Sequence, residues 1–349
     1  NAELTSFTEK IQIWIEKIRA KQDVHELKSS DLQSPDAGGL RERLSVMLEK
    51  TVFSPPVKSL LNQLKNILDS SQMNGRAAWI EERQDGTQFL QSVPEFPSRA
   101  LKEKLFDNFP TTLLIPPKSA ESLTEIIPKG QNVRFEDCER SVFDLVPIDF
   151  EDRNPESILK NPQAKKIIML LPSRRLIEEA FVKYTEQLEE KGITLICQNL
   201  SGGLERMQAE FTAAPSPCIW MLTPWTYELV TLPPETAGLL AISSLPFDHP
   251  GNFLFSKRSL HYRDSFSDYS LPRLEHRLFR LIRTFCRHKT SDGRIAILDK
   301  RLTEKKYGER IKKYLEQFAM EEDLGQKKPS ARKKTRGTAV VPEDQMALF

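Results

Sequence analysis

Residues 164–197 read AKKIIMLLPSRRLIEEAFVKYTEQLEEKGITLIC and contain three predicted elements in succession. The run from Ile167 to Leu171 is continuously apolar, which is typical of a strand that is buried on both faces. Ser173 then opens an amphipathic helix that extends to about Lys191, and Ile193 to Cys197 form a second apolar run. This order predicts two parallel strands joined by a helical crossover.

The same alternation continues toward the carboxyl end. Further apolar runs at 218–222, 239–243 and 295–298 are predicted to be strands. We therefore predict an α/β domain over residues 164–318, with a parallel sheet between helices. Ligands of such sheets bind beyond the carboxyl ends of the strands, so functional residues are expected in the loops that follow them.

The rest of the chain has a different pattern. Apolar residues spaced by three and four from Phe7 to Ile18 predict a helix, and further helices are predicted at 40–50 and 57–68. Residues 1–110 are thus expected to be helical, and residues 111–163 to connect them to the α/β domain. From Gly325 the sequence is basic and lacks apolar periodicity, so residues 319–349 are expected to be a disordered tail.

The composition is that of a globular protein, because 39% of the 349 residues are hydrophobic and 29% are charged. No apolar run approaches the roughly 20 residues of a membrane-spanning helix, so no membrane partner is expected. The four cysteines, at 138, 197, 218 and 286, show no paired spacing. This favours the cytoplasm over an oxidising compartment and argues against a zinc or iron–sulfur site, so we expect no metal on this chain.

The net charge of +2 conceals a strongly basic segment. Between Ser256 and Lys313 there are 17 Lys and Arg residues against seven Asp and Glu. Binding to a phosphate backbone requires such an excess, although a solvated helix face is the alternative explanation. The segment predicts DNA binding, either to single strands or to junctions, through Arg277, Arg287 and Lys289.

Several motifs lie at the loops of the predicted α/β domain and on the helix that precedes its last strand. They are Leu171-Pro172-Ser173, Leu200-Ser201-Gly202-Gly203 followed by Arg206, Thr223 through Glu228, Leu245-Pro246-Phe247, Tyr269-Ser270-Leu271-Pro272, His276 through Arg283, and Leu298-Asp299-Lys300-Arg301. In order and spacing they resemble the second motor domain of the XPD/DinG-type DNA helicases of superfamily 2. The resemblance covers residues 164–315 and implies a RecA-like domain, preceded by the end of the family's arch-like helical insertion.

The resemblance also implies roles for individual side chains. Arg280 and Arg283 match arginines that reach the γ-phosphate held by the other motor half, and Glu228 matches a motif glutamate. These are the catalytic candidates, either vestigial or acting in trans. The alternatives are a pair of surface or DNA-backbone arginines and, for Glu228, a surface carboxylate. The other motifs add three DNA-binding candidates, Ser173, Arg206 and Trp225. A place in the core is the alternative for Trp225.

Two departures from the family pattern bear on activity. The family's Gln-Gly-x-Gly-Arg is replaced by His276-Arg277-Leu278-Phe279-Arg280, and its Trp-Glu-Gly-x-Asp by Tyr227-Glu228-Leu229-Val230-Thr231. The sequence also contains no Gly-x-x-x-x-Gly-Lys-Thr phosphate loop and no Asp-Glu-x-His. We therefore expect no cofactor on this chain, with ATP and magnesium bound only if a complete motor is assembled.

The chain ends in Gln345-Met346-Ala347-Leu348-Phe349, which resembles the bacterial sliding-clamp-binding pentapeptide. The resemblance implies a sliding clamp as a partner through Gln345, Met346, Leu348 and Phe349; burial of the peptide against its own domain is the alternative. Two functions are therefore open. One is a helicase-derived DNA-binding subunit of replication or repair, associated with the nucleoid and without its own ATPase. The other is the carboxyl-terminal part of an active DinG-type helicase whose nucleotide-binding half is on a missing segment or another chain.

Overall fold

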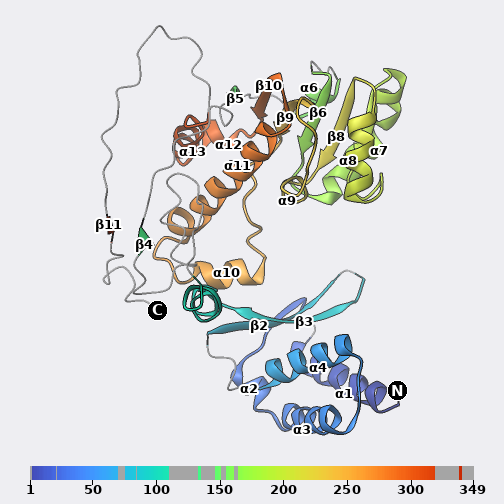
Figure 1. The fold of residues 1–349 in the computed structure, drawn as a ribbon, viewed down its shortest axis with the longest axis vertical. Coiled ribbons are helices and arrows are strands. Elements are labelled where there is room, and N and C mark those ends of the chain that lie inside the picture. The colour runs from blue at the N-terminus through green and yellow to red at the C-terminus, as the bar shows by residue number, and fades with distance from the viewer. Residues whose placement is uncertain are drawn as a thin grey trace.

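The computed structural model describes residues 2–20, 22–69, 75–83, 85–109, 133–134, 146–150, 155–160, 164–318 and 338–339. These residues form an amino-terminal unit of helices and an antiparallel sheet, followed by an α/β domain (Figure 1). A further antiparallel pair joins β4 (Val133–Arg134) to β11 (Thr338–Ala339). The predicted connecting segment lies mostly outside the described residues. So do Cys138, the tail except for β11, and the whole peptide from Gln345 to Phe349.

The α/β domain is built on a six-stranded parallel sheet of order β5-β10-β9-β6-β8-β7. The strands are β5 (Ile148–Phe150), β6 (Lys166–Leu170), β7 (Thr194–Cys197), β8 (Cys218–Leu222), β9 (Ala237–Ile242) and β10 (Lys289–Ile297). Every strand predicted from an apolar run is therefore present, and the predicted RecA-like class of parallel sheet is confirmed.

Helices cover both faces of this sheet, which explains why its strands are apolar throughout. Alternate residues of β6 belong to different cores, with Ile168 and Leu170 on one face and Ile167 and Met169 on the other. One face packs against α6 (Pro155–Lys160) and α7 (Arg174–Glu190). The other packs against α8 (Leu204–Ala213), α9 (Pro224–Tyr227), α11 (Leu271–Cys286) and α13 (Gly308–Leu315).

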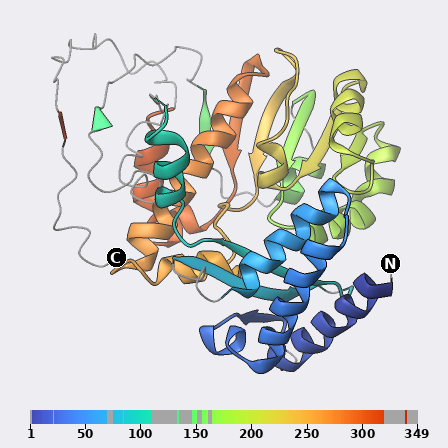
Figure 2. The ribbon, with the colours of Figure 1, turned by 60° about the horizontal axis from the view of Figure 1, so that its bottom comes forward.

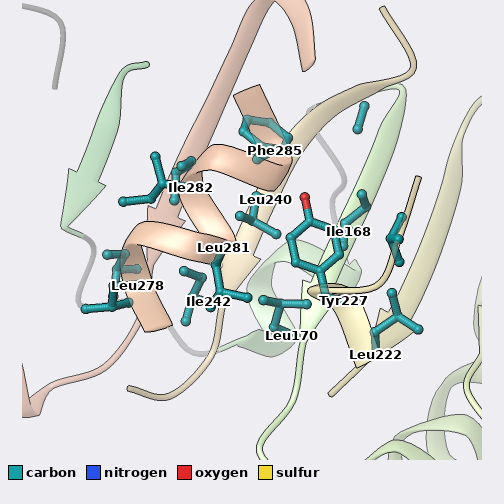
Figure 3. Packing of buried hydrophobic residues seen from close by; sticks show 14 of the residues in the cluster. Ile168, Leu170, Leu222, Tyr227, Leu240, Ile242, Leu278, Leu281, Ile282 and Phe285 are labelled. Carbon is teal, nitrogen blue, oxygen red and sulfur yellow. The ribbon is translucent and has the colours of Figure 1, made fainter. Parts of the chain in front are cut away.

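Helix α11 is the central element of this second core. Its residues Leu278, Leu281, Ile282 and Phe285 recur at helical spacing and point toward Ile168, Leu170, Leu240 and Ile242 of the sheet (Figure 3). Leu278 and Leu281 are fully buried, and truncating such a side chain to Ala typically costs about 2–5 kcal/mol. Because one face of α11 is fixed in this way, its arginines are confined to the opposite face.

The amino-terminal unit contains α1 (Ala2–Arg19), α2 (Ser29–Leu32), α3 (Pro35–Lys50) and α4 (Pro55–Leu68). The three predicted helices are confirmed, but α3 begins at Pro35 rather than Leu40, because Ser34 caps it by accepting from the Ala37 amide (3.4 Å). The unit also has an antiparallel sheet of β1 (Val24–Glu26), β2 (Arg76–Glu82) and β3 (Gln88–Pro94), which the helical prediction missed. Asp85-Gly86 turns this hairpin, with Gly86 at φ +78° and the Thr87 amide bound to Asp85 Oδ1 (2.9 Å).

The β2–β3 hairpin lies between the amino-terminal helices and α10 (Phe253–Ser259) of the α/β domain (Figure 2). The rings of Trp79 and Phe253 are 5.0 Å apart, and Arg258 Nε donates to the main-chain oxygen of Glu95 (2.6 Å). His261 Nε2 is 2.6 Å from Glu95 Oε1. Short helices α5 (Ser98–Leu101) and α12 (Arg301–Glu304) and π-helical turns at Lys102–Phe106 and Ser265–Ser270 complete the described elements. None of the described helices is both long and apolar enough to span a bilayer.

Candidate functional site

Charged side chains gather at the carboxyl edge of the sheet, where the loops after β8 and β9 meet α11. Asp248, in the loop after β9, accepts from Arg273 Nε (2.6 Å) and from an Arg277 guanidinium nitrogen (2.9 Å). Glu228 follows α9 and pairs with Arg280 at 2.9 Å. Three arginines of one helix face are therefore held by two carboxylates of the same domain.

The pair of Glu228 and Arg280 joins two of the predicted catalytic residues. The Glu228 side chain is only 9% exposed, whereas that of Arg280 is 51% exposed. Burial raises the pKa of Glu228, while the charges of Arg280 and Arg277 oppose this shift and Asp248 adds to it. The electrostatic attraction that Arg280 could offer to a phosphate is thus already directed at a carboxylate.

Arg277 has a structural position rather than that of an exposed DNA contact. Its side chain is 13% exposed, and its guanidinium lies 4.8 Å from the centroid of the Trp225 ring. Burial also lowers its pKa, with Asp248 and Glu228 opposing the shift. Arg277 therefore links Trp225 to Asp248, and Trp225 itself is 40% exposed rather than a core residue.

The predicted DNA-binding residues lie at two opposite edges of the sheet. Ser173, Arg206 and Trp225 follow the carboxyl ends of β6, β7 and β8, and Arg277 lies beside Trp225. Arg287 ends α11 and Lys289 begins β10, which places both at the amino edge. The structure therefore does not bring the six residues into one surface. Ser173 caps α7 by accepting from the Leu176 amide (3.3 Å), which gives it a structural role as well.

Arg206 stands next to a glycine that the turn requires. Gly202 has φ +102°, and a Cβ added there would lie 2.9 Å from Arg206 Cδ. The first glycine of the Ser-Gly-Gly motif is therefore explained by local backbone geometry, and the Arg206 side chain is exposed.

Exposed basic residues continue along α11 beyond the paired arginines. Arg283 is exposed one turn after Arg280, and Arg287 is exposed one turn further on. His276, the counterpart of the family's glutamine, is half-buried, and burial together with the nearby arginines lowers its pKa. An imidazole with a lowered pKa is neutral at physiological pH, so it adds no charge to this helix.

The Leu-Asp-x-Arg motif has a clear structural role. Asp299 accepts from the Leu245 amide (2.6 Å) and from Arg301 Nε (3.0 Å), and Arg301 donates to Ser244 Oγ (2.9 Å). Burial raises the pKa of Asp299, but the hydrogen bonds from Arg301 and the Leu245 amide outweigh it and the pKa is lowered overall. The motif therefore fixes the loop after β9, which positions Asp248.

Sequence reasoning missed Asp248 and Arg273. The available signal was an acidic residue directly after Leu245-Pro246-Phe247, in a loop at the carboxyl edge of the sheet. Within the described ranges, no three His, Cys, Asp or Glu side chains are grouped as a metal site. Cys197 and Cys218 are buried, and burial raises the pKa of each thiol to about 12.

The comparisons with known proteins bear on the fold of the α/β domain. Residues 156–318 match the family model of the helicase C-terminal domain. A solved structure titled XPD apo shares the fold with a TM-score of 0.55 at 13% identity, covering 90% of this chain and 69% of that one. One titled XPD helicase has a TM-score of 0.48 at 11% identity, covering 88% of this chain and 67% of that one. No curated protein matches the chain.

The match confirms the coarse part of the sequence interpretation. The α/β domain is similar to a helicase C-terminal domain, and its fold is that of an XPD-type motor domain. The roles of individual residues, the erosion of the motifs and the clamp-binding tail stay predictions.

Proposed function

We propose that this chain is a helicase-derived DNA-binding or scaffold subunit of DNA replication or repair that does not hydrolyse ATP on its own. The observation that supports this most directly is the ion pair between Glu228 and Arg280. A helicase arginine at this position is expected to reach toward a nucleotide, whereas here a buried carboxylate of the same domain holds it. The missing phosphate loop supports the same interpretation.

DNA binding is proposed to use the exposed basic residues at the end of α11. Arg283 and Arg287 are exposed, and Lys289 follows them at the start of β10. Other basic side chains of the segment are paired, including Arg294 with Asp149 and Arg310 with Glu275. Only part of the basic excess is therefore available for phosphates. Such contacts bind the backbone without reading sequence.

Fluorescence anisotropy with a labelled single-stranded oligonucleotide at several salt concentrations tests this function. Affinity should fall steeply with salt, because binding releases counterions. The double variant Arg283→Glu/Arg287→Glu should bind about tenfold more weakly or worse and show a shallower salt dependence. Lys10→Glu/Lys50→Glu, which makes the same charge change on α1 and α3, is the matched control. Equal losses in both variants, or affinity independent of salt, would remove the proposal.

The alternative is the carboxyl-terminal part of an active ATP-dependent helicase of the DinG type, whose first motor domain lies on a missing segment or another chain. The position of Arg283 favours it, because this arginine is exposed one turn from Arg280 and can point at a nucleotide held by a second domain. An upstream coding sequence with a phosphate loop and Asp-Glu-x-His would decide for this alternative. ATP and magnesium would then be bound by the assembled motor.

We further propose that the peptide from Gln345 to Phe349 tethers the chain to a sliding clamp. The Gln345 amide can both donate and accept, and Met346, Leu348 and Phe349 can fill an apolar cleft. The basic linker before the peptide would let it reach a clamp while the α/β domain holds DNA. This recruitment implies a cytoplasmic, nucleoid-associated protein.

A further inference from the structure

A pocket of about 310 Å³ opens where α9, α10 and the beginning of α11 meet. Its volume is at the low end of the roughly 300–1,000 Å³ of small-molecule sites, so it has room for one ring system rather than several. Its lining combines aromatic rings, an imidazole, one amide, two guanidinium groups and one carboxylate, with Trp225, Asn252, Phe255, Arg258, Tyr269 and Arg273 among its members. The carboxylate is that of Asp248, which is already paired with Arg273 and Arg277.

Two of these groups suit a planar ligand. Trp225 is 40% exposed and is held by Arg277 over its ring, so an aromatic surface is presented in a fixed orientation. Asn252 accepts from the Phe255 amide through Oδ1 (2.9 Å), which leaves its Nδ2 to donate to a ligand. A fixed aromatic ring and an amide donor together match the flat face and the polar edge of a nucleobase.

Arg258 supplies a positive charge at the same pocket. It donates through Nε to the Glu95 carbonyl oxygen (2.6 Å) and through a terminal nitrogen to that of Pro94 (3.4 Å). Both acceptors are neutral, so its charge is not offset there, unlike that of Arg273 with Asp248. A ligand with a negative group beside its ring would gain from this charge.

We propose that this pocket binds one unpaired nucleobase of single-stranded DNA, stacked on Trp225, with the adjoining phosphate near Arg258. The inference rests on the proposed DNA-binding function and adds to it the place where a base is held. It also gives the carboxyl edge of the sheet a role in binding, separate from the basic residues Arg283 and Arg287 at the end of α11. A free nucleotide carries the same base and phosphate groups, so the test has to distinguish it from single-stranded DNA as the ligand.

The test uses an oligonucleotide with a single 2-aminopurine, whose fluorescence is quenched by stacking. Wild-type chain should quench it on binding. Trp225→Ala should abolish the quenching and weaken binding about fivefold or more, since one stacked base is worth about 1–3 kcal/mol. Trp225→Phe should restore most of both effects. Leu229→Ala, also on the loop after β8 and 67% exposed, is the control and should match wild type. Asn252→Asp keeps the cap oxygen but removes the amide donor, and should also weaken quenching.

The outcomes separate this pocket from DNA binding itself. If wild type and Trp225→Ala bind the oligonucleotide with equal affinity and equal quenching, the pocket is wrong and the DNA-binding function stands. If no version binds DNA, both proposals fall. 2-Aminopurine mononucleotide is measured in parallel. If the mononucleotide is quenched and the oligonucleotide is not, the ligand of the pocket is a free nucleotide and the proposal of single-stranded DNA is wrong.

Discussion

The buried pair of Tyr227 and His288 shows how single residues hold the candidate site. The Tyr227 hydroxyl lies 2.9 Å from His288 Nε2, and the two rings meet edge to face at 5.9 Å. Burial raises the pKa of Tyr227 well above its usual value and lowers that of His288 to about 4. Tyr227 directly precedes Glu228, so this neutral hydrogen bond fixes the backbone that presents the carboxylate to Arg280.

This pair predicts loss of stability on mild acidification. The folded pKa of His288 lies below the usual value of 6.5, so the unfolded chain binds its proton more tightly. The contribution of His288 to the free energy of unfolding is therefore fully present above about pH 6.5. It declines by on the order of 3 kcal/mol as the pH falls toward 4. The double variant Tyr227→Phe/His288→Phe should lack this component, whereas Tyr227→Phe alone should cost about 1–3 kcal/mol at pH 7. Urea unfolding between pH 7 and 5 measures this, and an unchanged pH profile in the double variant would contradict it.

At the level of single residues, the sequence singled out candidate side chains but could not show how they are paired. Glu228, Arg280 and Arg283 could be found because their motifs have fixed spacing. The partner of Arg277 could not, because Asp248 is brought to it by a loop that the hydrogen bonds of Asp299 hold in place. A count of charges likewise cannot show that Arg277 and Arg280 are paired while Arg283 and Arg287 are exposed.

At the level of elements, the strands of the sheet were predictable and the hairpin was not. Strands buried on both faces are continuously apolar, so β6, β8 and β9 stand out in the sequence. The hairpin's β3 is only half-buried along its whole length, so its sequence lacks such a run. The turn at Asp85-Gly86 was the remaining signal. The docking of the hairpin to α10 depends on tertiary contacts that no local sequence pattern encodes.

The contact between the hairpin and α10 predicts that Phe253 fastens the two units. Phe253→Ala removes the ring that packs 5.0 Å from Trp79. Such aromatic pairs contribute about 0.5–1.5 kcal/mol beyond their buried area. Hydrogen exchange at β3 and α10 should therefore become faster in this variant while β6 and β8 keep their protection. Val182→Ala, at an 84% exposed site on α7, is the control. Unchanged exchange at β3 would show that the hairpin is held by other contacts.

At the scale of the whole molecule, the proposed clamp tether makes a separable prediction. A tethered peptide gives up conformational freedom on docking, so an affinity near the micromolar range, about −8 kcal/mol, is expected. The full chain should bind a labelled clamp, and the triple variant Gln345→Ala/Leu348→Ala/Phe349→Ala should not. DNA affinity of the triple variant should be unchanged, which separates the two activities. Equal clamp binding by both chains, or by neither, would remove the tether.

The whole molecule is proposed to retain the motor fold and DNA binding while lacking autonomous ATP hydrolysis. Hydrolysis requires backbone amides and a lysine on the phosphates together with magnesium held by a carboxylate, and the sequence contains neither motif that supplies them. Arg280, the residue that would stabilise the transferred charge, is bound to Glu228 instead.

The most direct test of this claim is steady-state phosphate release by the purified chain with saturating single-stranded DNA. Arg280→Ala is measured in parallel, so that a contaminating ATPase, which this substitution would not affect, can be recognised. We predict only background release, equal in the two proteins and not stimulated by DNA. DNA-stimulated release by the wild-type chain that Arg280→Ala abolishes would contradict the account.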